Sequence, residues 1–161
     1  MSACSAHTHH RCVDRALTRA AALCTQHGLR LTPLRRQVLV LVWESHRPAK
    51  AYDILTKLQR HEPAAKPPTV YRALDFLLDN GLIHKLHRKN AYIGCAHPQQ
   101  GGACFFLICT QCNTVTEGED PTFAQFVQHA TQAYGFVPHH TTFEVEGLCG
   151  NCSAGTQAAA R

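Results

Sequence analysis

Two short cysteine motifs in the C-terminal part of the chain have the residue types and the spacing for metal chemistry. Cys109 and Cys112 form one Cys-x-x-Cys pair, and Cys149 and Cys152 form the other. Each pair can occupy one edge of a tetrahedron, and four thiolates complete the coordination sphere of a zinc ion. Because a complete sphere leaves no position for a substrate, the spacing predicts a structural site. The alternative is a redox-active dithiol, although the βαβ frame of thioredoxin-like motifs is not visible here.

A second group of possible metal ligands lies in the middle of the chain. It contains the imidazole, thiol and carboxylate groups that zinc accepts together. Taken singly, each of these residues is more often a packing or surface group. If they bridged two domains, a metal ion bound to them would fix the relative orientation of the domains. The group consists of His84, His87, Cys95, His97, Cys104 and Glu117.

The cysteine count also bears on the cellular compartment. Nine cysteines are an odd number and many for 161 residues, and a reducing compartment argues against a disulfide framework. The N-terminus lacks the apolar core of a secretion signal, and no apolar run approaches the roughly 20 residues of a membrane helix. We therefore expect a cytoplasmic protein whose cysteines bind metal.

Each Cys-x-x-Cys pair forms a knuckle, and its cysteines need elements of secondary structure that position them. Residues 105–108 read as a buried strand leading into the first knuckle, and residues 113–116 as its returning partner. A helix is predicted over 121–134, and residues 141–146 alternate as a strand leading into the second knuckle. The last residues, 153–161, read as a tail. This pattern predicts a small α/β domain.

The N-terminal half carries helical patterns. Apolar residues recur at helical spacing from Val13, and Gly28 is a natural stop. A second helix should begin with Thr32 as N-cap and Pro33 in the first position. A third, short helix is predicted over 51–58.

A fourth predicted helix begins after Lys66 and ends at Gly81, and its polar face opens with Thr69, Tyr71 and Arg72. In helix-turn-helix proteins, the N-terminal residues of the recognition helix reach the base edges. Arginine can bind guanine O6 and N7, and tyrosine can pack on a thymine methyl group or bind a phosphate. The pattern therefore favours a DNA-reading helix.

Residues 83–87 and 91–94 then read as a hairpin with a basic tip at Arg88, the wing of a winged helix whose tip would suit the DNA backbone. A plain helical bundle with a solvated hairpin is the alternative. The predicted DNA-binding residues are Lys66, Thr69, Tyr71, Arg72 and Arg88.

Charge is divided unevenly between the halves. Residues 1–89 carry 15 Lys/Arg against six Asp/Glu, a balance of +9, whereas residues 90–161 carry one against five, a balance of −4. A basic half beside an acidic half indicates that one of them meets a polyanion, with an ordinary solvated surface as the alternative.

The predicted fold class is α+β: an N-terminal winged helix-turn-helix DNA-binding domain followed by a small C-terminal α/β domain. The expected organisation is a disordered tail over 1–12, a winged-helix domain over 13–95, a hinge loop over 96–103, a zinc-stapled domain over 104–152 and a tail over 153–161.

Three strings precede the two knuckles: RLTPLR (30–35), KPPTVYRALDFL (66–77) and GLIHK (81–85). Together with the knuckles, they resemble the ferric uptake regulator family, and most of all its zinc uptake regulator branch. The likeness covers about residues 17–152. It implies that the C-terminal α/β domain is a dimerisation domain. It also implies a homodimer whose zinc-loaded form binds an AT-rich inverted repeat in double-stranded DNA and represses zinc-uptake genes.

The resemblance also implies roles for individual residues. It implies that the structural zinc is bound by Cys109, Cys112, Cys149 and Cys152. It also implies that Tyr71 and Arg72 contact bases. The regulatory zinc falls on His84, Cys95 and Glu117, with a histidine from the following loop.

The sequence departs from the family at that last ligand, because the family position of the loop histidine is Gly102 here. His97 is our choice for the fourth ligand, with Cys104 or a water molecule as alternatives. His139 and His140 are expected to be surface groups. The N-terminal His/Cys-rich stretch, which contains Cys4, His7, His9, His10 and Cys12, is expected to hold no fixed site.

Other functions stay open. An iron-, manganese- or peroxide-responsive member of the same family is one, although Cys95 among the ligands favours zinc over metals that prefer His and carboxylate. An enzyme is another. A zinc deaminase needs a His-x-Glu, which the chain lacks, and a thiol oxidoreductase would have no use for the basic half. We therefore expect that the protein is not an enzyme.

Overall fold

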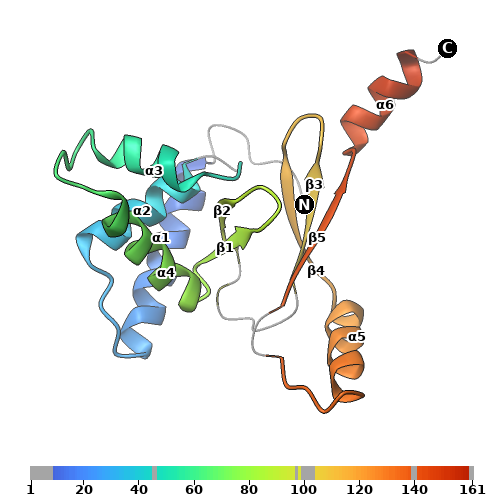
Figure 1. Cartoon of the computed structure of the whole chain (residues 1–161), viewed down its shortest axis with the longest axis horizontal. Coiled ribbons are helices and arrows are strands. Elements are labelled where there is room, and N and C mark those ends of the chain that lie inside the picture. The colour runs from blue at the N-terminus through green and yellow to red at the C-terminus, as the bar shows by residue number, and fades with distance from the viewer. Residues whose placement is uncertain (1–8, 45–46, 97, 99–103, 139–140, 160–161) are drawn as a thin grey trace. The chain divides into compact units, whose positions relative to one another are not determined.

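The computed structural model describes residues 9–44, 47–96, 98, 104–138 and 141–159. The chain divides into two compact units, residues 1–99 and 100–161 (Figure 1). Helices and strands both contribute, which confirms the predicted α+β class. In the described part of the chain, no helix combines the length and the apolar character needed to cross a membrane.

The first unit places four helices before a two-stranded hairpin. Its elements are α1 (His9–Gln26), α2 (Pro33–Trp43), α3 (Ala51–Leu58), α4 (Pro67–Asp79), β1 (Ile83–Leu86) and β2 (Ala91–Gly94). The two strands are antiparallel, and a bridge between Ala49 and Tyr92 adds a short third segment. This order is that of a winged helix, as predicted.

The predicted helix starts are mostly local in origin. Thr32 caps α2, since its hydroxyl accepts a hydrogen bond from the Arg35 N–H at 3.4 Å, and α3 has the predicted bounds. α1 differs, because it begins at His9 rather than at Val13, so residues 9–12, expected in the tail, are helical. No glycine or proline interrupts these residues, so the helix extends beyond its first core residue.

The core of the first unit joins one face of each helix to the hairpin. Completely or almost completely buried members include Ala20, Val38, Leu39, Val42, Ile54, Leu58, Val70, Leu74, Leu77 and Ile83. α4 therefore presents its apolar face inward and keeps its opposite face for solvent or a ligand.

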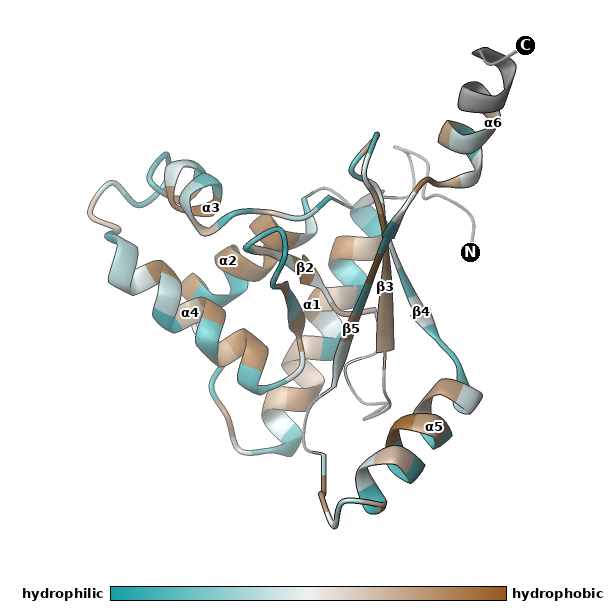
Figure 2. Cartoon of the chain, turned by 45° about the vertical axis from the view of Figure 1, so that its right-hand side comes forward, coloured by the Kyte–Doolittle hydropathy of each residue, from teal (hydrophilic) through white to brown (hydrophobic). Residues whose placement is uncertain are grey.

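The second unit is a three-stranded sheet with two helices. Its elements are β3 (Cys104–Cys109), β4 (Val115–Glu119), α5 (Pro121–Gln132), β5 (Thr142–Gly147) and α6 (Gly150–Ala159). The strand order is β4-β3-β5, with β4 antiparallel and β5 parallel to β3. A parallel neighbour needs a crossover connection, and α5 lies in that connection. Figure 2 shows that β3 is a largely apolar strand.

Aromatic residues join α5 to one face of this sheet. The Phe123 ring lies 5.8 Å from the Phe105 ring and 5.3 Å from the Phe143 ring, measured between centroids. A Cβ at Gly118 would lie 2.3 Å from the Phe105 ring, so the ring covers a position where only glycine fits. The opposite face carries the buried side chains of Cys104 and Phe106.

Two predicted segments of this unit need correction. β4 begins at Val115 rather than Asn113, because Asn113 has a φ of 58° and belongs to the turn. The residues from Ser153, predicted as a tail, continue a helix to Ala159. Alanine has the highest helix propensity, and this segment is rich in it.

Candidate metal centre and DNA-binding face

The four knuckle cysteines meet at one end of the second unit's sheet. β3 and β5 are parallel neighbours, and Cys109 is the register partner of Gly147. The carboxyl ends of parallel neighbours lie at the same edge, so the first knuckle, which starts at Cys109, and the second, which starts at Cys149, are brought side by side. The four sulfur atoms all lie within 4.8 Å of one another.

The geometry of this cluster fits a tetrahedral metal ion. The Sγ atoms of Cys112 and Cys149 are 3.8 Å apart, which is the edge of about 3.8 Å of a tetrahedron with zinc–sulfur bonds of about 2.3 Å. A disulfide would bring the sulfur atoms to about 2.05 Å. The Cys149 N–H donates to Cys109 Sγ at 3.4 Å, and the Thr114 hydroxyl lies 3.2 Å from Cys112 Sγ.

These contacts give the thiols of Cys109, Cys112 and Cys152 different pKa values. The pKa of the Cys109 thiol is lowered to about 6, first by the Cys112 N–H and next by the Cys149 N–H, which favour its thiolate. The Thr114 hydroxyl lowers the pKa of Cys112. The pKa of Cys152 is raised to about 12, mainly because its thiol hydrogen-bonds to the Cys149 sulfur. Cys152 therefore retains a proton beside the Cys109 thiolate, and a bound metal cation would displace that proton.

This donor set suits zinc. Four thiolates are the ligands of closed structural sites, in which zinc supplies a crosslink and no catalytic water. In this unit such a crosslink would join the ends of β3 and β5, which β4 and α5 separate along the chain.

The wing carries two further predicted ligands. His84 pairs with Ile93 in the hairpin, and the Cys95 N–H donates to the Leu82 carbonyl at 3.1 Å, which extends the ladder by one position. Residues two positions apart share a face, so His84 and Cys95 are diagonal neighbours on one face of the wing. Both side chains are buried.

The second unit carries a comparable pair. Cys104 pairs with Glu119 and Phe106 pairs with Glu117, so Cys104 and Glu117 are diagonal neighbours on one face of the sheet. The Cys104 sulfur and a Glu117 carboxylate oxygen lie within 4.8 Å of each other. Cys104 is therefore placed to act with Glu117 on a single ion.

Several predicted positions lie outside the described residues. These are His97, His139, His140, Cys4 and His7, together with most of the predicted hinge at 96–103.

The polar face of α4 is arranged as a recognition helix requires. The side chains of Lys66, Tyr71 and Arg72 are exposed at its N-terminal turns, and Thr69 is half-buried. Val70 and Leu74 are buried on the opposite face. Arg88 is exposed at the tip of the wing.

Sequence reasoning missed contacts that support these residues. The Arg35 guanidinium lies 3.5 Å from the centre of the Phe76 ring and so joins α2 to α4. A Cβ at Gly94 would lie 2.1 Å from the Trp43 ring, so the wing lies directly against α2. Each contact joins residues about 40 or more positions apart, and no local pattern signals it.

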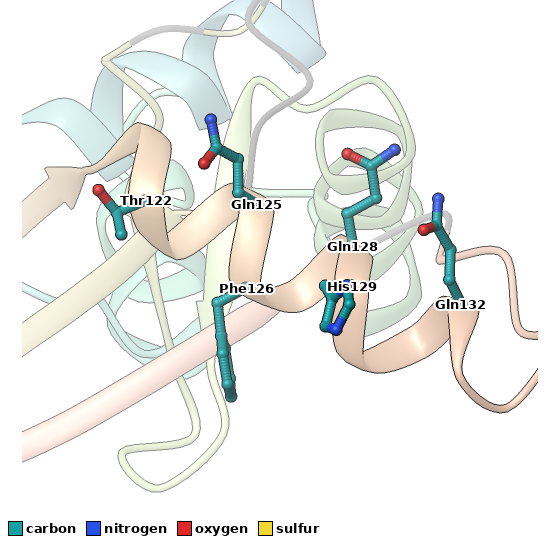
Figure 3. A pocket seen from close by; sticks show the side chains of 6 residues that line it. All are labelled: Thr122, Gln125, Phe126, Gln128, His129 and Gln132. Atoms are coloured by element: carbon teal, nitrogen blue, oxygen red, sulfur yellow. The ribbon is translucent and has the colours of Figure 1, made fainter.

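The second unit exposes a large apolar surface. β5 is an edge strand of the described sheet, and Phe143 and Val145 on it are exposed. The outer face of α5 exposes Phe126 and His129 around a shallow depression (Figure 3). Further exposed apolar residues are Leu107, Tyr134, Phe136, Val137 and Leu148. This number of exposed large apolar side chains on a small unit favours an interaction surface there.

Comparison with known proteins places the chain in a family. Residues 26–146 match the ferric uptake regulator family. The chain is 41% identical over 140 residues to the zinc uptake regulation protein of Escherichia coli (strain K12). The alignment covers 84% of this chain and 80% of that protein.

Two solved structures give the same result. A zinc uptake regulator complexed with zinc and DNA has a TM-score of 0.83 at 36% identity, covering 90% of this chain and 97% of that chain. The holo form of XcZur has a TM-score of 0.77 at 42% identity, covering 86% and 96%. With its winged helix, its four-cysteine cluster and these relatives, the chain belongs to the ferric uptake regulator family, in its zinc uptake regulator branch.

Proposed function

We propose that the protein is a zinc-dependent transcriptional repressor of the cytoplasm, which binds operator DNA as a homodimer when zinc-loaded and represses zinc-uptake genes. One observation carries the proposal. The exposed recognition face of α4 and the His84–Cys95 pair belong to one continuous helix–hairpin element. A metal ion bound at the wing therefore acts on the element that reads DNA.

Two zinc ions per subunit have separate roles in this proposal. The first, held by Cys109, Cys112, Cys149 and Cys152, is structural. The second is regulatory and is held by His84, Cys95 and Glu117 with a fourth ligand.

For that fourth position, His97 keeps the ligand type of the family, and Cys104 is supported by its burial and its proximity to Glu117. A water molecule would complete the set if neither binds. All three arrangements suit zinc, because it accepts mixed sulfur, nitrogen and oxygen ligands.

The proposed domains are a DNA-binding domain over 13–95, a hinge over 96–103 and a dimerisation domain over 104–152. Filling the regulatory site would tie ligands of the first and second domains together. In the dimer, this would hold two recognition helices at a spacing of roughly 34–36 Å, one turn of DNA. A differential affinity of a few kcal/mol for this form is enough for a large change in occupancy.

Dimerisation is assigned to the second unit. β5 offers an edge strand, and an edge with apolar neighbours such as Phe143 and Val145 is a template for pairing with another chain. The homodimer would then present two copies of α4 to an inverted repeat.

We propose no enzymatic role. A four-thiolate site leaves no position for a substrate, and the basic half has a use in a DNA-binding protein that it lacks in a thiol oxidoreductase. An iron-, manganese- or peroxide-responsive regulator of the same family is the second candidate, and the thiol of Cys95 disfavours it.

The test is operator binding measured against buffered free zinc, with metal counted on the same sample. About one tightly held zinc per subunit and a gain in operator affinity when a second one binds would support the proposal. DNA binding that is indifferent to zinc while metal stays bound would contradict it, and repeating the titration with iron and manganese would then test the second candidate.

A further inference from the structure

A hydrogen bond ties α1 to the segment that leaves the wing. The Arg19 guanidinium donates through Nη1 to the carbonyl oxygen of Ala96, 77 residues further along the chain. Ala96 directly follows Cys95, whose N–H makes the last rung of the hairpin with Leu82 at 3.1 Å. Arg19 therefore holds the backbone at the point where the ladder ends.

One other contact restrains the same segment. Gly94 lies against the Trp43 ring, so closely that a Cβ would be 2.1 Å from it. The residues directly before and after Cys95 are thus held by α2 and by α1, respectively.

Arg19 differs from these neighbours in how it can be tested. Trp43 and Gly94 pack closely, so that substitution at either position disturbs the packing of the unit. The Arg19 side chain is exposed on the outer part of α1, while the same helix buries Leu17, Ala20 and Leu23. Removing the guanidinium therefore removes one restraint and leaves the core intact.

The restraint matters because of what Cys95 is proposed to bind. A strand end beyond its last rung frays, and a metal ligand on a frayed end must be ordered when the ion binds. Groups that position a metal ligand contribute to metal affinity without touching the metal. Their loss lowers the metal affinity by about 10–100-fold.

We propose that Arg19 is a positioning residue for Cys95. Through this positioning, Arg19 sets the free zinc concentration at which the repressor becomes active. It contacts neither the metal nor a DNA base. The metal part of this inference rests on the proposed function, whereas the backbone restraint rests on the hydrogen bond alone.

The experiment compares the full-length wild type with Arg19→Ala, Arg19→Lys and Arg15→Ala. Arg15 lies one turn earlier on α1, is also exposed, and its substitution removes the same charge. The first measurement is amide hydrogen exchange of residues 94–96 without added regulatory zinc. We expect faster exchange in Arg19→Ala, with wild-type rates in Arg15→Ala and partial recovery in Arg19→Lys.

The second measurement is competition for zinc against a chromophoric chelator, followed by operator binding at saturating zinc. We expect Arg19→Ala to bind the regulatory zinc about tenfold more weakly, with structural zinc and saturated operator affinity unchanged. Unchanged exchange together with unchanged zinc affinity would overturn the inference. So would a loss of operator affinity at saturating zinc with zinc binding intact, because Arg19 would then be a DNA contact.

The outcomes also separate this inference from the proposed function. If the wild type binds no second zinc, the proposed function fails, and the metal part of the inference fails with it. Faster exchange in Arg19→Ala under that outcome would still uphold the restraint on Cys95.

Discussion

The Sγ atoms of Cys112 and Cys149 lie 3.8 Å apart although 37 positions separate the two residues. The contact exists because β3 and β5 run parallel and side by side, so that the knuckle following each strand emerges at the same edge. The distance is the edge of a zinc–sulfur tetrahedron, so a zinc ion bound there would crosslink the two strand ends.

Replacing Cys149 with serine should remove the structural zinc and unfold the second unit. Structural zinc contributes about 10–16 kcal/mol in small metal-stabilised domains, far more than a single sheet of this size can replace. Metal analysis and circular dichroism would test this. Cys12→Ser is the matched control, since Cys12 lies in α1, and it should retain full metal content.

Zinc binding at the four cysteines should weaken as the pH falls. Cys152, with a pKa raised to about 12, is protonated at neutral pH and must release its proton to bind metal. Cys109, with a pKa lowered to about 6, is already a thiolate at pH 7 and gains a proton only below about pH 6. The affinity should therefore fall at least about tenfold per pH unit from pH 8 to 6 and more steeply below.

Competition titrations between pH 5.5 and 8 would measure this slope. Calorimetry in buffers of different ionisation enthalpy would count the protons, with at least one released per zinc at pH 7. An affinity that is constant over this range would rule out the assignment of protons to these thiols.

Arg72→Ala should cost about 1–3 kcal/mol of operator binding and relax the choice of base, if Arg72 reads a base edge. Lys66→Ala is the comparison, since a phosphate contact should weaken binding to every sequence and lower the salt slope by about one. Both side chains are exposed near the start of α4. Competition with operator variants at two salt concentrations separates the roles, and a uniform loss with Arg72→Ala would exclude base reading.

His84→Ala should abolish the zinc dependence of DNA binding while the structural zinc remains. His84 is buried on the ligand face of the wing, whereas His87, just beyond the end of β1, is exposed. His87→Ala is therefore the control and should keep the wild-type zinc response. Applying the same titration to His97→Ala and Cys104→Ala would identify the fourth ligand, and a full response in both would assign that position to water.

Gly94→Ala should destabilise the first unit by at least about 1–3 kcal/mol, because overpacking forces neighbouring atoms apart. The added Cβ would meet the Trp43 ring at 2.1 Å. Trp43 is the only tryptophan of the chain, so its fluorescence during urea unfolding reports on this unit. Wild-type stability of the variant would show that the wing does not pack on α2 in solution.

The sequence by itself determined the features that arise within a few residues. Thr32 and Pro33 mark the start of α2 because a cap is a local hydrogen bond. The apolar spacing marks α3 and α4 because it follows the period of a helix. The cysteine spacing marks the knuckles, and the KPPTVYRALDFL string marks the family. The predictions from the sequence were wrong at ends of helices and strands that lack a strong local signal, as at His9, Asn113 and Ser153.

Tertiary structure alone decided which distant groups meet. The register of β3 with β4 puts Cys104 beside Glu117, and the approach of α1 to the end of the wing puts Arg19 on the Ala96 carbonyl. Such contacts depend on how whole elements pack, and they leave no periodic trace in the residues between them. The ligand types of a metal site are therefore readable from the sequence, whereas the groups that hold those ligands in position are visible only once the chain has folded.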